Sequence, residues 1–274
     1  MTKDLASSLV PSSPEAQDPG RAFRPDVEGL RAVAVAVVVL YHAGVPGFSG
    51  GYVGVDVFFT ISGFVITKLL LRQVDRYGRP HFAEFYACRA RRILPAASLV
   101  VLGTIIASYL WLGFIRGNET ATDARWVAVF LGNNHFASVG ENYFQSEMPP
   151  SPLLNYWSLA VEEQFYVVYP AAIALLVVLL PRWPIRTKLV TFTGTVFILS
   201  LSWSAYYTSV NSAATYYSIS TRAWELALGG FIAASTGFWP WIPRTIYATL
   251  AWVGTAAILV AVVFFSSSTA YRGG

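Results

Sequence analysis

The feature that most constrains the fold is a series of apolar segments, each long enough to cross a lipid bilayer. A hydrocarbon core of about 30 Å requires roughly 20 consecutive apolar residues in a helix. Only 12% of the residues are charged, against about 25% in an ordinary soluble domain. We therefore predict an all-α polytopic membrane protein of about seven transmembrane helices, at residues 29–48, 52–72, 93–113, 155–180, 188–209, 219–236 and 245–265.

Residues 114–154 do not fit an ordinary span. Their apolar part, WVAVFLGNNHFASV, is short and carries Asn133, Asn134 and His135 at its centre. We expect one re-entrant or half-buried helix here, since irregular backbone is tolerated at membrane depth where it lines a cavity. The segment NYFQSEMPPSP that follows, with three prolines, is expected to be an exposed outer loop.

Basic residues gather in loops on one side of the predicted spans. The opposite loops, 49–51 and 210–218, contain no Lys or Arg. The positive-inside rule therefore places the N-terminus and the basic loops in the cytoplasm, as in a multi-pass protein of the inner (plasma) membrane. Residues 1–24 are polar and lack apolar periodicity, so they are expected to form a disordered cytoplasmic tail. The basic loops hold Arg72, Arg76, Arg79, Arg89, Arg91, Arg92, Arg182, Arg186, Lys188 and Arg244.

Composition and residue spacing argue against a nucleic-acid partner, a disulfide framework and a metal site. The net charge of +4 requires no nucleic-acid partner, because the basic residues lie where orientation signals belong. Cys88 is the single cysteine, which excludes an internal disulfide framework. His42, His81 and His135 are scattered without metal-ligand spacing, so we predict no metal site.

Arg31 and His42 lie in one apolar run and are the first candidate site residues. Eleven residues at about 100° each bring both side chains to the same helix face, ~16 Å apart along the axis. This spacing predicts Arg31 at the membrane edge and His42 about halfway across. An imidazole at that depth favours a functional role, with a structural histidine bonded to a neighbouring helix as the alternative.

Asp56 lies early in the second predicted span, just after the short turn PGFSGG. Such a turn makes the first two spans antiparallel neighbours, and His42 and Asp56 then have similar predicted depths. A carboxylate beside the imidazole would fix its tautomer and raise its basicity, as in sites that activate a hydroxyl. The alternative is a capping or packing carboxylate near the outer interface.

Four more ionisable residues lie inside predicted spans. Glu162 and Glu163 diverge by about 100° on a helix, so at most one points into a central cavity. They are either substrate contacts or a structural hydrogen-bond hub. Arg222 and Glu225 are three residues apart and can pair, either as a neutralised buried pair or as groups that position substrate.

Arg89, Arg91 and Arg92 either set the topology alone or also hold an anionic cytoplasmic ligand. Arginine binds phosphate through bidentate, charge-assisted hydrogen bonds. With Arg31 on the same side, four guanidinium groups are expected to converge on one pocket. Such a pocket would suit a phosphorylated donor such as coenzyme A.

Five ordered motifs resemble those of the membrane acyltransferase-3 family, whose members are bacterial integral-membrane enzymes that O-acylate surface carbohydrates. The resemblance extends from about Phe23 to the end of the chain, and the family's Arg-x10-His signature falls on Arg31 and His42. The motifs are RPDVEGLRAVAVAVVVLYH, GGYVGVDVFFTISGFVIT, FYACRARRILP, NYWSLAVEEQFYVVYP and STRAWELALGG.

The resemblance implies transfer of an acyl group, most often acetyl, from cytoplasmic acyl-CoA to a hydroxyl of a cell-envelope carbohydrate. No permanently bound cofactor is implied, and the partners are acyl-CoA, the carbohydrate acceptor and membrane lipid. His42 would be a general base or a transient acyl carrier oriented by Asp56. Arg31, Arg89, Arg91 and Arg92 would hold the donor, and Glu162, Glu163, Arg222 and Glu225 would line the pathway.

Two departures from the family pattern bear on these expectations. Cys88 stands where family members usually have the first of two paired arginines, which would weaken donor binding. The family's membrane domain has more spans than this chain and is often followed by an SGNH hydrolase-like domain. We therefore expect residues 25–274 to be a partial, truncated acyltransferase domain without that SGNH domain, a possible partner. An inactive remnant and a membrane transporter remain the alternatives.

Overall fold

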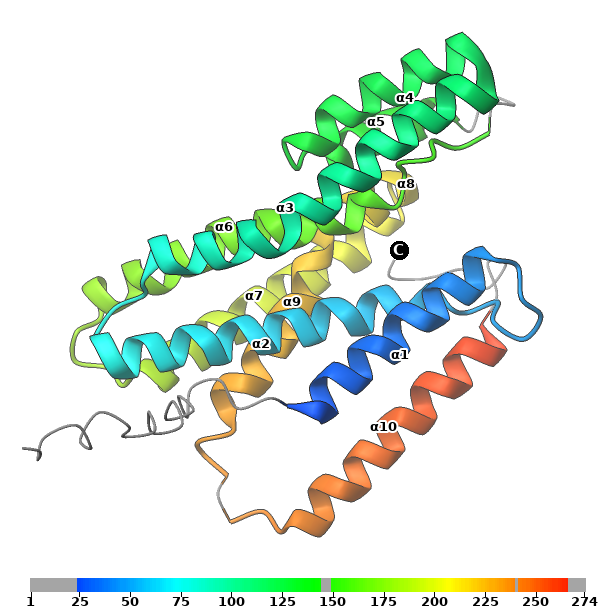
Figure 1. Cartoon of the computed structure of the whole chain (residues 1–274). Helices are drawn as coiled ribbons and strands as arrows, with labels where there is room; N and C mark the ends of the chain where they lie inside the picture. Colours follow the sequence, from blue (N-terminus) through cyan, green and yellow to red (C-terminus); the bar gives the residue numbers. More distant parts are fainter. Residues whose placement is uncertain (1–23, 144–148, 240, 266–274) are drawn as a thin grey trace, which may run out of the picture.

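The computed structural model describes residues 24–143, 149–239 and 241–265, and every regular element in these ranges is a helix (Figure 1). The predicted disordered tail therefore lies almost entirely outside the described residues, as do residues 144–148 of the predicted outer loop. The elements are α1 (Pro25–His42), α2 (Val53–Tyr77), α3 (Phe82–Ala107), the π-helical turn η2 (Ser108–Leu112), α4 (Gly113–Ala128), α5 (Gly132–Tyr143), α6 (Tyr156–Leu179), α7 (Ile185–Thr208), α8 (Ser212–Tyr217), α9 (Ile219–Ser235) and α10 (Arg244–Phe264).

Among the described residues, five helical segments are long and apolar enough to cross a membrane. This confirms the prediction of an all-α polytopic membrane protein. The predicted spans at 29–48 and 219–236 are also helices but fall short of that description. The first contains three charged residues within 18, and the second is 17 residues long. The five segments are Val53–Tyr77, Phe82–Ala128, Tyr156–Leu179, Ile185–Thr208 and Thr245–Phe264.

The first helix lies earlier in the chain than its apolar pattern predicts. It begins at Pro25, where the fixed φ of proline suits the first helical position, and it ends at His42. Gly44 and Gly47 then adopt positive φ of 68° and 87° in the turn toward α2. The apolar residues after His42 therefore belong to a loop, which moves the end of the helix by about two turns from the prediction.

The core of the bundle lies where α9 packs between α2 and α7. Gly63 of α2 rests on the carbonyl of Leu226, and Gly229 of α9 rests on the carbonyl of Thr60. A side chain at either glycine would overlap that backbone, so the two small residues permit the close crossing. The surrounding buried side chains come from four helices: Phe59, Leu70, Val161, Ile173, Leu189 and Leu226.

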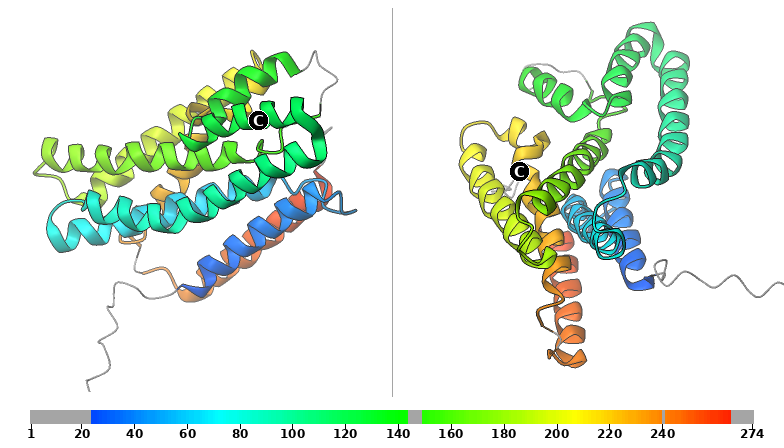
Figure 2. Two further views of the ribbon diagram at one scale, coloured as in Figure 1. Left: turned by 45° about the horizontal axis from the view of Figure 1, so that its top comes forward. Right: turned by 90° about the vertical axis from the view of Figure 1, so that its left-hand side faces the viewer.

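The predicted single re-entrant helix within 114–154 is wrong, because this stretch forms two helices. The chain leaves α3 through η2, reverses at Gly113 with φ of 84°, and forms α4. A second break follows at Phe130, whose φ is 55°, before α5 begins. Figure 1 shows α4 and α5 at one end of the bundle, and the views in Figure 2 place them on the opposite side from α10.

The last described helix, α10, contacts the rest of the chain mainly through its C-terminal turn. The Gly50 N–H donates to the Val262 carbonyl at 2.9 Å, and Ser49 Oγ donates to the Phe265 carbonyl at 2.8 Å. Only 6% of the residues in its most apolar stretch are buried. Most of the helix thus presents apolar side chains outward, as a lipid-facing helix does.

Candidate functional site

A cavity of about 460 Å³ lies between α1, α2, α3 and α6 and is lined by five arginines and a set of apolar side chains. Arg72 and Arg76, on the last turns of α2, lie toward one end. Arg31 lies toward the other, with its guanidinium 5.3 Å from the ring centroid of Phe58. Arg89 and Arg92 of α3 complete the basic set, and the other lining residues include Phe58, Ser62, Val65, Ile66, Leu69, Glu84, Cys88, Leu159, Glu162 and Tyr166.

Arg89 connects this cavity to the two adjacent glutamates of α6. One of its terminal nitrogens lies 2.8 Å from Glu163 Oε1 and 3.7 Å from Glu162 Oε1. The guanidinium carbon lies 3.5 Å from the ring centroid of Tyr166, whose hydroxyl donates to Glu162 Oε1 at 2.6 Å. Glu162 lines the cavity and Glu163 does not. This is the divergence expected of neighbours on a helix.

The expected convergence of four arginines holds for Arg31, Arg89 and Arg92 but is wrong for Arg91. Arg91 is exposed, is not among the lining residues, and donates from Nε to the Ala87 carbonyl of its own helix at 3.2 Å. The reason is helical geometry. Residues three apart share a face, whereas Arg91 is turned about 100° from its neighbour Arg92. Arg72 and Arg76 also line the cavity, although their positions in the sequence indicated only orientation signals.

His42 is the last residue of α1, so its predicted place in the middle of a span is wrong. Its Nδ1 lies 2.8 Å from the carbonyl oxygen of Val38, within the same helix. Because a carbonyl can only accept, Nδ1 must carry the hydrogen, and the neutral ring then has its lone pair on Nε2. The side chain is exposed, so this lone pair is accessible, although His42 is not among the residues that line the cavity.

The predicted pairing of Asp56 with His42 is wrong, because Asp56 Oδ1 instead accepts from Arg222 at 2.9 Å. The register of the two helices explains the difference. Gly51 lies against Val37 and Tyr41, near the end of α1. Asp56 is five residues further along an antiparallel helix, ~7 Å away from the level of His42. The orienting group for His42 is therefore a backbone carbonyl and not a carboxylate.

Arg222 is the centre of a buried network that ties α9 to α2. Its terminal nitrogen donates to Asp56 Oδ1 and, at 2.7 Å, to Glu225 Oε1, while Nε donates to the Tyr216 carbonyl at 3.1 Å. Arg222 is 1% exposed and Glu225 is fully buried. Neither lines the cavity described above. Of the two roles left open for this pair, the neutralised buried pair is the one that this geometry favours.

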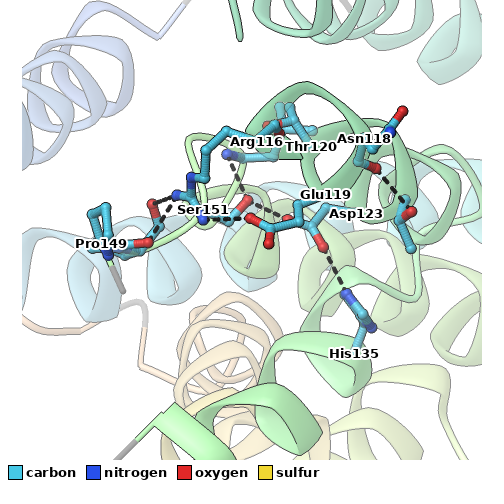
Figure 3. Close-up of polar contacts among 11 residues, drawn as sticks. Arg116, Asn118, Glu119, Thr120, Asp123, His135, Pro149 and Ser151 are labelled. Atoms are coloured by element: carbon cyan, nitrogen blue, oxygen red, sulfur yellow. Dashed lines mark hydrogen bonds and ion pairs between the residues drawn. The ribbon is translucent and has the colours of Figure 1, made fainter. Parts of the chain in front are cut away.

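A second polar cluster lies between α4, α5 and the segment before α6, and Figure 3 shows its contacts. His135 Nε2 lies 2.8 Å from Asp123 Oδ1, and Ser151 Oγ donates to the other oxygen of the same carboxylate. Arg116 pairs with Glu119 at 2.7 Å and donates to the carbonyls of two prolines, 149 and 150. These bonds hold the three segments together. The histidine–aspartate pair was not predicted, because its members lie on different helices, α4 and α5.

Among the described residues, no group of three or more His, Cys, Asp or Glu side chains is placed to hold a metal ion. The cavity instead offers guanidinium groups, which bind phosphate or carboxylate oxygens. Cys88 is exposed and lines the cavity, so a ligand there would meet its thiol. The arrangement can therefore bind an anionic ligand with an apolar portion.

Comparison with known proteins gives a consistent family signal. The family model described as an acyltransferase domain matches residues 24–273. The peptidoglycan O-acetyltransferase OatA of Listeria monocytogenes is 32% identical over 261 residues, and the putative peptidoglycan O-acetyltransferase YrhL of Bacillus subtilis is 34% identical over 274. Each alignment covers 92% of this chain and 41% of the relative. No solved structure matches the chain significantly.

A putative O-acetyltransferase of Staphylococcus aureus is also similar, with 30% identity over 253 residues. That alignment covers 89% of this chain and 40% of the relative. The chain thus spans about two fifths of the length of the curated relatives it matches.

Proposed function

This chain belongs to the acyltransferase family whose model matches residues 24–273, and from that premise we propose that it is an integral-membrane O-acyltransferase. It moves an acyl group, acetyl by analogy with the named relatives, from acyl-CoA to a hydroxyl of a cell-envelope carbohydrate. Peptidoglycan is the acceptor that the relatives' names favour. The observation that carries the proposal is the arginine-lined cavity.

The cavity suits acyl-CoA because it combines two kinds of surface. Coenzyme A carries a diphosphate and a further phosphate, and arginines bind such oxygens through charge-assisted hydrogen bonds. Phe58, Val65 and Leu69 line the same space and suit the apolar parts of the donor. We place the end of the cavity near Arg76 at the cytoplasmic face of the inner membrane, because basic loops gather on that side.

His42 supplies the base for the acceptor hydroxyl. Its unprotonated Nε2 takes the proton as the hydroxyl oxygen attacks the thioester carbon, and the carbon–sulfur bond breaks. Coenzyme A leaves as a thiolate and recovers the proton from the imidazolium. Support comes from the bond between Nδ1 and Val38, which fixes the required tautomer. Arg31, eleven residues earlier on α1, lies at the cavity, and His42 lies ~16 Å further along the same helix, so the acyl end of the donor has to extend past Arg31 to reach the base.

The donor site is tested by a matched pair of variants at two adjacent arginines of α3, of which only Arg92 lines the cavity. We expect Arg92→Ala to weaken acetyl-CoA binding by about tenfold or more, because a charge-assisted hydrogen bond to phosphate contributes ~1.5–3 kcal/mol. Arg91→Ala removes the same charge from the same helix, but the Arg91 side chain does not line the cavity. The affinity of this variant for acetyl-CoA should therefore change less than twofold. Calorimetric titration of the chain in lipid nanodiscs measures both.

Equal weakening by the two variants would indicate a general effect of charge and would count against a donor site in this cavity. Failure of the unaltered chain to bind acetyl-CoA would overturn the proposed donor itself.

A further inference from the structure

A second group of positive charges lies at the C-terminal end of α9, outside the arginine-lined cavity. Lys68 of α2 and Arg186 of α7 approach this end, and neither is among the residues that line the cavity. Lys68 Nζ donates to Thr236 Oγ1 at 2.9 Å, directly after the last residue of α9. A terminal nitrogen of Arg186 lies 2.9 Å from the place that a Cβ of Gly237 would take. Because Thr236 and Gly237 are adjacent, the ammonium and the guanidinium face the same short stretch of chain.

The charges of Lys68 and Arg186 are not neutralised by the described residues around them. Lys68 makes no ion pair, and Arg186 makes neither an ion pair nor a hydrogen bond, with any described residue. The other charges that act on the Lys68 ammonium, those of Arg24 and Arg72, are positive as well. Arg24 already pairs with Asp26. Since like charges repel, an anion bound between Lys68 and Arg186 would lower the electrostatic energy of this end of the bundle.

Cations at a helix C-terminus also interact favourably with the carbonyls of the last turn. That role accounts for part of the cluster, because the Lys68 ammonium is held beside the end of α9. It leaves most of the hydrogen-bond donors unused, however. An ammonium has three donors, of which Lys68 uses one, and a guanidinium has five, of which Arg186 uses none toward the described residues. The cluster can therefore bind the oxygens of an anionic ligand.

An apolar surface lies one helical turn from these charges, toward the middle of the bundle. Phe64 precedes Lys68 by four residues on α2, and the ammonium lies 5.7 Å from the centroid of its ring. Ile232 precedes Thr236 by four residues on α9 and is 44% exposed. Residues four apart share a helix face, so the apolar and the charged side chains form two successive levels of one surface. A ligand that fits this surface has an anionic head and an apolar body.

We propose that the phosphate of an anionic phospholipid binds between Lys68 and Arg186, with its acyl chains along Phe64 and Ile232. Basic pockets between membrane helices bind such headgroups through charge-assisted hydrogen bonds. A lipid of the leaflet at this end of the bundle has its headgroup and its chains at these two levels. Free phosphate has no chains to contact the apolar level. The proposal goes beyond the acyl transfer proposed above and does not depend on it.

The test counts the lipids that the full chain binds in detergent, by native mass spectrometry. Dioleoyl phosphatidylglycerol has a net negative charge, whereas dioleoyl phosphatidylcholine has the same chains and no net charge. We expect the first phosphatidylglycerol to bind about tenfold or more tightly than phosphatidylcholine, because two cations contact its headgroup. Millimolar inorganic phosphate should not displace it.

Lys68→Gln and Arg186→Gln should each weaken phosphatidylglycerol binding about fivefold and leave phosphatidylcholine binding unchanged. Arg186→Lys keeps the charge and should bind phosphatidylglycerol within about twofold of the unaltered chain. Arg91→Gln is the matched control, because Arg91 is exposed and lies as far from the start of α3 as Lys68 lies from the end of α2. It removes one positive charge at a similar depth and should change the affinity less than twofold.

Equal binding of the two lipids by the unaltered chain would overturn the site. Equal weakening by Arg91→Gln would also overturn it, because the attraction would then belong to the whole basic end of the bundle. Displacement by inorganic phosphate would assign the cluster to a small anion and exclude the lipid. The thermal unfolding midpoint in lipid-free detergent shows whether the glutamine variants are folded. If their midpoints fall, Arg186→Lys decides, since loss of phosphatidylglycerol binding with the charge retained contradicts the proposal.

Discussion

Replacement of Arg222 by methionine is expected to destabilise the folded protein by about 3–5 kcal/mol. Methionine fills a similar volume, so the loss comes from charge and not from a cavity. In the unaltered chain the carboxylates of Asp56 and Glu225 lie 2.9 and 2.7 Å from the Arg222 guanidinium. Without the guanidinium, these two carboxylates are left close together with no positive charge between them. A buried carboxylate with no counter-charge is costly, because burial removes its hydration.

The measurement is the midpoint of thermal unfolding in detergent, which should fall on the order of 10 °C. Arg91→Met is the matched control, because Arg91 is exposed and its loss removes one positive charge without stranding a buried carboxylate. The triple variant that also carries Asp56→Asn and Glu225→Gln should recover much of the lost stability. An unchanged midpoint in Arg222→Met alone would contradict the role of this network as a neutralised buried cluster.

The fold class could be predicted because segment length and apolar composition are local properties. Helices α2, α6, α7 and α10 lie close to the apolar runs that indicate them. The end of α1 was placed too late because the prediction followed apolar length alone, although Gly44, Pro46 and Gly47 after His42 are helix-breaking residues. What ends the helix is the turn with positive φ at Gly44. The break at Phe130 differs, since a positive φ at a phenylalanine has no sequence signal.

The site was only partly predictable for a different reason. The pairing of Arg222 with Glu225 follows from a spacing of three residues on one helix. Its bond to Asp56 joins residues 166 apart, and that contact depends on how α2 and α9 cross. The same holds for Arg72 and Arg76. Their sequence position explains orientation in the membrane, and only the arrangement of α1, α2, α3 and α6 around one cavity shows that they line it.

Replacement of His42 by glutamine is expected to reduce acyl transfer by roughly 10²–10⁴-fold, the usual contribution of a general base. Glutamine retains a hydrogen-bonding side chain but has no basic nitrogen. Because His42 is not among the residues that line the cavity, the affinity for acetyl-CoA should stay within about twofold of that of the unaltered chain. The measurement is the rate at which labelled acetyl passes from acetyl-CoA to peptidoglycan fragments in reconstituted vesicles.

His81→Gln is the control, since it makes the same chemical change just before α3, where the ring packs against Tyr77 at 4.2 Å. It should leave the rate nearly unchanged. The split between rate and affinity separates a base from a residue that only supports the structure, because a packing defect in α1 would also move Arg31 and weaken donor binding. A His42→Gln chain that transfers acetyl at the original rate would exclude His42 as the base, whatever its affinity for the donor.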